Sequence, residues 1–207
     1  MKQRLHPDQV LLRVRQPDEI FAGRRGAAEV IIVQPEIASL AQAHALAGQL
    51  VEQVAHDGIA FAALYSSDLL RARQTAEVIA QHLGLPIQLD ARLREVNLGV
   101  WEGMLGDEVA LRYVAELDER RRDPVHSRPP QGETVFELAA RVGQALDDIA
   151  QAHPHANVIV VSHGLAIAAV LCLANGRPLE QVFAQIPDNA APQIITWWGH
   201  HPASCKP

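Results

Sequence analysis

Three basic side chains and one hydroxyl in this sequence follow apolar runs of the kind that form buried strands. Arg15, Arg71 and His163 each come shortly after such a run, and Ser67 precedes Arg71 by one helical turn. Arginine presents a planar fork of N–H donors that matches phosphate oxygens, and a helix that starts after Ser67 would add backbone donors and the positive end of its dipole. If the runs are neighbouring parallel strands, their carboxyl ends meet at the edge where open α/β sheets bind ligands. The sequence therefore predicts a phosphate-sized cationic pocket.

The elements that must position these residues alternate between strand and helix, which is typical of a mostly parallel sheet with helices on both faces. Residues 157–161 form a near-continuous apolar run, the pattern of a strand buried on both faces. Gly84 closes a helical pattern whose N-cap candidates include Ser67 and Asp68. We therefore predict one three-layer α/β domain over residues 1–207. Strands are expected at 10–14, 60–65, 86–89, 157–161 and 194–198, and helices at 37–55, 69–83, 108–122, 134–152 and 164–173.

The composition argues against several kinds of partner. A net charge of −6 gives no attraction to nucleic acid or to an anionic membrane, and no apolar run approaches the roughly 20 residues that cross a bilayer. The two cysteines, Cys172 and Cys205, suggest no disulfide framework, so a cytoplasmic protein is expected. The histidines show no ligand spacing with carboxylates or cysteines, so no metal and no other cofactor is expected. The expected partner is a phosphorylated small molecule or a phosphate or sulfate anion, and the sequence leaves a homodimer open.

Five elements of the sequence, in order along the chain, form a recognisable pattern. They are Tyr65-Ser66-Ser67-Asp68-Leu69-Leu70-Arg71-Ala72-Arg73-Gln74-Thr75-Ala76, Leu93-Arg94-Glu95 with Leu98-Gly99-Val100-Trp101-Glu102-Gly103, Pro130-Gln131-Gly132-Glu133-Thr134, Val160-Val161-Ser162-His163-Gly164, and Asn189. Together they resemble the signature of the histidine phosphatase (phosphoglycerate mutase-like) superfamily. The resemblance implies the phosphoglycerate mutase-like form of the three-layer fold. It also implies a reaction in which a histidine attacks phosphorus and becomes phosphohistidine.

The resemblance also implies a role for each site residue. Arg71 and His163 would hold phosphoryl oxygens as the second arginine and second histidine of the family, and Arg15 would be the first arginine. Ser67 would add a hydroxyl to the same pocket. Glu95 would be the general acid that protonates the leaving group, which requires an environment that keeps its proton near neutral pH.

The first motif departs from the family pattern, because no Arg-His-Gly follows an early strand. In Arg15-Gln16-Pro17 a glutamine stands where the attacking histidine is expected, and Val33-Gln34-Pro35 is a second candidate that lacks the arginine. We favour Gln16, because Gln42, which resembles a residue of the family's first helix, follows Gln34 too closely to leave room for the usual substrate loop. The exact alignment of residues 15–36 with the family stays open.

A glutamine at the nucleophile position excludes the reaction through phosphohistidine. The amide nitrogen has its lone pair delocalised into the carbonyl, so Gln16 can hydrogen-bond in place of an imidazole but cannot form a phospho-enzyme. The leading hypothesis is a phosphoglycerate mutase- or phosphatase-like protein that binds a phosphate ester without turning it over. A second is an active phosphomonoesterase, either phosphatase or mutase, that uses another nucleophile or direct attack by water. A third is a structural or interaction subunit whose pocket is unused.

Overall fold

A five-stranded sheet forms the centre of the protein. The computed structural model describes residues 27–35, 40–187 and 192–198. The strand order is β3-β2-β4-β1-β5, in which the first four strands are parallel and β5 runs antiparallel to β1 at one edge. The strands are β1 (Ala28–Val33), β2 (Phe61–Ser66), β3 (Ile87–Leu89), β4 (Asn157–Val161) and β5 (Gln193–Trp197).

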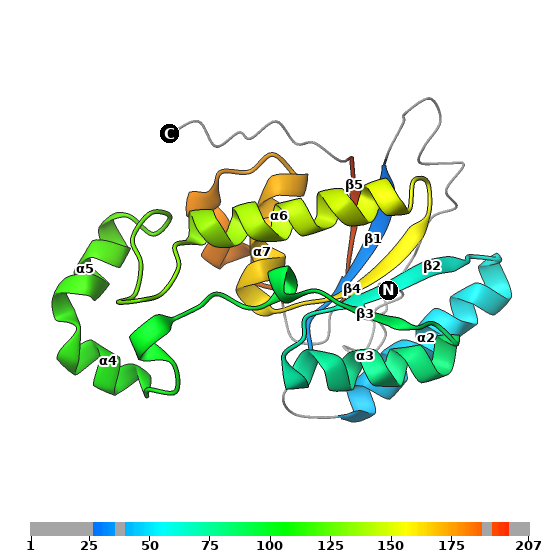
Figure 1. Cartoon of the computed structure of the whole chain (residues 1–207), viewed down its shortest axis with the longest axis horizontal. Coiled ribbons are helices and arrows are strands. Elements are labelled where there is room, and N and C mark those ends of the chain that lie inside the picture. The colour runs from blue at the N-terminus through cyan, green and yellow to red at the C-terminus, as the bar shows by residue number, and fades with distance from the viewer. Residues whose placement is uncertain (1–26, 36–39, 188–191, 199–207) are drawn as a thin grey trace, which may run out of the picture.

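Helices cover both faces of this sheet, as Figure 1 shows. On one face α2 (Leu40–Asp57) and α3 (Leu70–Leu83) pack over the side chains of Ile31, Leu64 and Ile159. On the other face α6 (Val135–Ala152) and α7 (Gly164–Ala174) enclose a larger core. Every residue of β1 and of β4 is buried, because alternate side chains of each strand enter opposite cores. The predicted three-layer α/β architecture is confirmed.

Two short helices lie to one side of the layers, at the left of Figure 1. They are α4 (Gly106–Arg112) and α5 (Val114–Arg122), and a non-helical Tyr113 separates them where the sequence predicted one helix over 108–122. Short 3₁₀ turns, η1 (Ala91–Leu93), η2 (Gly99–Trp101) and η3 (Leu179–Gln185), complete the structure. The guanidinium of Arg120 connects α5 with η2 and η3 through cation–π contacts. It lies 6.0 Å from the ring centre of Trp101 and 5.6 Å from that of Phe183.

Two glycines bring the loop around η2 into direct backbone contact with residues 129–133. Gly99 has a φ of 56°, and a Cβ there would overlap the carbonyl oxygen of Pro130. A Cβ on Gly132 would lie 2.6 Å from the backbone oxygen of Asn97. Backbone hydrogen bonds from Val100 to Pro130 and from Glu133 to Asn97 join the two segments. Because only hydrogen atoms fit between these backbones, the two loops are held as one unit.

Most strands form close to where the sequence predicts them, and the difference lies at the start of the chain. The run at 10–14, predicted as the first strand, lies outside the described residues. The strand between β4 and β5 is instead Ala28–Val33, which we did not predict. Only six residues separate its end from α2, as the element bounds show. No helix in the described part of the chain is both long and apolar enough to cross a membrane.

Candidate functional site

His163 lies at the centre of a small polar cluster at the carboxyl ends of β2 and β4. Its Nδ1 accepts a hydrogen bond from Nε of Arg71 at 3.1 Å. Because arginine can only donate, the neutral ring must carry its proton on Nε2, which then donates to Oγ of Ser67 at 2.8 Å. The structure therefore brings together Ser67, Arg71 and His163, three of the residues predicted from the sequence.

The environment of His163 disfavours a charge on its ring. Burial lowers the pKa of the imidazole to about 3, with further contributions from the positive charges of Arg71 and Arg141. His163 as a whole is only 2% exposed. His163 is therefore neutral at physiological pH and serves as a fixed hydrogen-bonding group.

The register of three parallel strands explains why these residues meet. Val161 at the end of β4 pairs with Ser66 on one side and with Val33 on the other. The backbone N–H of Ser67 donates to the carbonyl of Val161 at 2.9 Å, and that of Ser162 donates to the carbonyl of Val33 at 3.0 Å. The residues that follow β1, β2 and β4 thus emerge at one level of the sheet edge, as expected for a ligand site in an open α/β sheet.

The carboxylate of Glu95 lies at the N-terminus of α7, directly after His163. It accepts backbone hydrogen bonds from Leu165 at 3.1 Å and Ala166 at 3.2 Å, and one from Val96 at 2.9 Å. All three contacts have the carboxylate as acceptor, which is the arrangement of an anion at the positive end of a helix. In this structure Glu95 stabilises the helix that carries His163.

Arg141 on α6 holds the Glu95 loop in place. Its guanidinium donates to the backbone carbonyls of Arg92, Arg94 and Glu95 at 2.7, 2.8 and 2.9 Å. It also donates from Nε to a carboxylate oxygen of Glu133 at 3.0 Å. Our sequence analysis missed this residue, because nothing in a helical pattern marks one surface arginine as the partner of a distant loop.

Gln34 is the residue that follows the strand beside His163. A Cβ placed on Gly164 would lie 3.4 Å from Nε2 of Gln34, so the amide lies against the residue after His163. Arg15 and Gln16, which the sequence analysis placed here, lie outside the described residues. Because β1 lies beside β4, Gln34 is the candidate that follows this strand among the described residues. The residue before it is Val33, which is buried and carries no charge.

Two charged residues next to the site form a pair that the sequence analysis did not single out. Nε of Arg94 donates to Oδ1 of Asp68 at 2.6 Å, and Nη2 donates to Oδ2. Asp68 follows Ser67 and Arg94 precedes Glu95, so both lie within the motifs that resemble the family. Among the residues that the structure describes, no three His, Cys, Asp or Glu side chains gather as a metal site. Asn189 lies outside the described residues.

This three-layer α/β fold thus brings an arginine, a serine and a histidine together at one edge of its sheet. The family model of the histidine phosphatase superfamily (branch 1) matches residues 38–205, well over half of the chain. The chain therefore belongs to this superfamily. The matched region begins after both candidate first motifs, so the match does not extend to Gln16 or Gln34.

The chain is similar in sequence to proteins named probable phosphoglycerate mutase GpmB. It is 38% identical to that of Erwinia tasmaniensis over 117 residues, which cover 55% of this chain and 53% of the relative. It is 36% identical to that of Yersinia pestis over 141 residues, which cover 66% of this chain and 61% of the relative. The chain thus spans little more than half the length of the curated relatives it matches.

Solved structures of phosphatases share this fold. A putative alpha-ribazole-5'-P phosphatase from Escherichia coli superposes with a TM-score of 0.69 at 19% identity, over 82% of this chain and 90% of the other. A mycobacterial glucosyl-3-phosphoglycerate phosphatase, solved in complex with VO3, superposes with a TM-score of 0.65 at 25% identity, over 81% and 90% of the two chains. The predicted phosphoglycerate mutase-like fold is confirmed.

Proposed function

We propose that this protein binds a phosphate monoester or inorganic phosphate beside Ser67, Arg71 and His163, and does not transfer the phosphoryl group through phosphohistidine. The observation that carries the proposal is the amide of Gln34, which lies against Gly164 at the end of the strand beside His163. A carboxamide nitrogen donates its lone pair to the adjacent carbonyl, so it does not attack phosphorus. It can still donate a hydrogen bond to a bound anion.

The polar cluster has the donors that a phosphate needs. Arg71 supplies a guanidinium, and Ser67, whose oxygen accepts the Nε2–H of His163, keeps its own hydroxyl proton to donate to an anion. The mycobacterial phosphatase that shares this fold binds VO3 in one structure and inorganic phosphate in another. That likeness supports an anion as the ligand here. Arg15 stays a predicted additional phosphate ligand.

Two further features support binding without turnover. Val33 and Pro35 flank Gln34, so the arginine that would neutralise the phosphoryl group and the backbone donor after the nucleophile are both replaced. Glu95 accepts three backbone hydrogen bonds, whereas a general acid must present a proton to the leaving group. The proposed protein is thus a phosphate-ester-binding relative of phosphatases and mutases.

A turnover assay tests the proposal. We expect the unmodified chain to hydrolyse an aryl phosphate, and to convert 3-phosphoglycerate, no faster than its His163→Ala variant does. After incubation with the aryl phosphate, the paired change Gln34→His with Pro35→Gly should produce acid-labile phosphohistidine, because the new imidazole can attack phosphorus as the P–O bond to the aryl oxide breaks. The matched change Gln16→His with Pro17→Gly should not. Rapid turnover by the unmodified chain that is lost in His163→Ala would disprove the proposal and favour an active phosphomonoesterase.

A further inference from the structure

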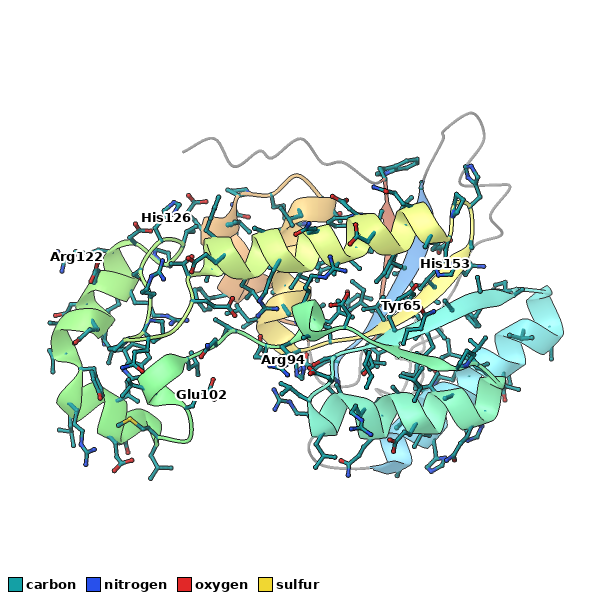
Figure 2. The ribbon with its side chains drawn as sticks, in the orientation of Figure 1. Tyr65, Arg94, Glu102, Arg122, His126 and His153 are labelled. Atoms are coloured by element: carbon teal, nitrogen blue, oxygen red, sulfur yellow. The ribbon has the colours of Figure 1, made fainter. Side chains whose placement is uncertain are left out.

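The ion pair between Asp68 and Arg94 joins two elements of the site. Asp68 lies just before α3 and Arg94 just after η1, and Figure 2 shows Arg94 beside the start of α3. The carboxylate engages Nε and Nη2 of the guanidinium in a two-point contact. The Nη1 edge of Arg94 makes no hydrogen bond with the described residues, and its side chain is 50% exposed. One edge of this guanidinium is therefore open to an incoming ligand.

The carboxylate of this pair is close enough to the polar cluster to act on it electrostatically. Asp68 is the residue after Ser67, whose Oγ contacts His163. The negative charge of Asp68 acts to raise the pKa of His163, against the larger opposing effects of burial and of Arg71 and Arg141. A phosphate dianion bound at His163 would also be repelled by the negative charge of Asp68, because the two like charges would lie close together.

The described cluster is short of positive charge for a dianion. Arg71 is the one guanidinium in direct contact with His163 among the described residues, and Val33 occupies the place of an arginine. Arg141 is engaged by Glu133 and by three backbone carbonyls, so it cannot turn toward a ligand without releasing the Glu95 loop. Arg94 is the nearby arginine whose only described side-chain partner is one partly exposed carboxylate.

We propose that Arg94 is the second guanidinium of the anion site, and that Asp68 competes with the ligand for it. The inference rests on the proposed function, since it assumes that a phosphate binds beside His163. A dianionic phosphate monoester would take up the open edge of Arg94 and weaken its contact with Asp68. To bind, a ligand must then interact with Arg94 strongly enough to displace Asp68. This favours dianionic phosphates over singly charged carboxylates, because a dianion is attracted more strongly to the guanidinium.

Calorimetric titration with inorganic phosphate, at one pH and one ionic strength, tests this competition. Removing the Asp68 charge in Asp68→Asn should tighten phosphate binding by about five- to tenfold, since one negative charge near a dianion is lost. Arg94→Gln should weaken binding about fivefold or more, because a charged donor pair is lost. The double variant should bind more weakly than Asp68→Asn alone.

The exposed pair of Arg121 and Asp118 provides a matched control, since its N–O distance is also 2.6 Å but it lies on α5. Asp118→Asn and Arg121→Gln should leave the dissociation constant within about twofold of the unmodified chain. If the Asp68→Asn variant does not fold, Arg94→Gln and Arg94→Lys are compared instead. Phosphate should then bind more weakly to the Arg94→Gln variant than to the Arg94→Lys variant. Circular dichroism establishes that each variant is folded.

The two proposals fail in different ways. If the folded, unmodified chain and every variant show no phosphate binding, the proposed function is wrong and the inference is wrong with it. If the unmodified chain binds phosphate and Arg71→Ala does not, the proposed function stands. An affinity that is then unchanged in Asp68→Asn and in Arg94→Gln overturns only the role of this pair.

Discussion

His163 is buried beside two guanidinium groups, and both features disfavour a proton on its ring. The hydrogen bond from Arg71 adds a third constraint, because a proton on Nδ1 would face a donor that cannot accept it. Protonation of this one residue therefore opposes the folded state.

The stability of the protein should report this effect as the pH falls. The folded-state pKa of His163 is about 3 against an ordinary value of 6.5, so the unfolded chain binds the extra proton between these values. The contribution of His163 to the free energy of unfolding should be constant well above pH 6.5 and fall as the pH drops through that value, with a loss of about 2 kcal/mol at pH 5. Urea unfolding of the unmodified chain and of His163→Gln checks this, and equal slopes between pH 5 and 7 would contradict it.

At the same scale, the sequence identified Ser67, Arg71 and His163, which the structure brings together. The preference for Gln16 over Gln34 stays a prediction, because residues 1–26 lie outside the described part of the chain. The runs 10–14 and 28–33 each contain one charged residue, so apolar patterning alone does not separate the two candidate strands.

At the scale of the element, Arg141 shows how one helix fixes a distant loop. Its guanidinium satisfies three backbone carbonyls, including that of Glu95, and it is less than one quarter exposed. Helix α6 itself begins with a capping box, in which Thr134 and Glu137 each accept a backbone hydrogen bond from the other. The Glu95 loop is therefore held in place by α6, a helix that contributes no residue to the polar cluster.

Arg141→Gln should destabilise the fold more than most single changes of a surface arginine. It removes the guanidinium donor from three carbonyls and the ion-pair partner from Glu133, whose carboxylate keeps only the backbone N–H of Asn97 among the described residues, and we expect a loss of about 2–3 kcal/mol in the free energy of unfolding. The exposed pair of Arg128 and Glu137 offers the comparison, since Arg128→Gln should cost under about 0.5 kcal/mol. Equal midpoints for the two variants in urea would show that the loop does not need Arg141.

Element boundaries were predictable where local chemistry sets them. Gly84 closes α3 in the left-handed conformation, with a φ of 68°, as its place after the helical pattern indicated. The start of α3 differs, because Ser67 and Asp68 make contacts with His163 and Arg94 that no local pattern reveals. Only the weaker bond from the N–H of Leu69 to Oγ of Ser67, at 3.3 Å, resembles the expected cap.

At the scale of the whole molecule, Gln34 and the polar cluster follow three strands that lie far apart in the sequence and side by side in the sheet. A ligand held there should stabilise the folded chain as a whole. The alternation of strands and helices predicted the layers, but the place of β1 between β4 and β5 follows from long-range pairing that periodicity does not encode.

Thermal unfolding in the presence of phosphate should show this stabilisation. At a phosphate concentration ten times the dissociation constant, mass action adds about 1.4 kcal/mol, or roughly 3 °C in the midpoint for a chain of this size. Sodium chloride at matched ionic strength separates binding from screening. Arg71→Ala should lose the shift, whereas Arg128→Gln should keep it, and an equal shift in both variants would locate the anion elsewhere.

The backbone contact between Gly99 and the Pro130–Gly132 segment bears on the history of this protein. Neither glycine tolerates a side chain, Glu133 holds Arg141, and Glu95 caps α7, so these family motifs are needed for folding whether or not a reaction occurs. Selection for a folded chain alone would therefore preserve these motif residues, with or without phosphoryl transfer.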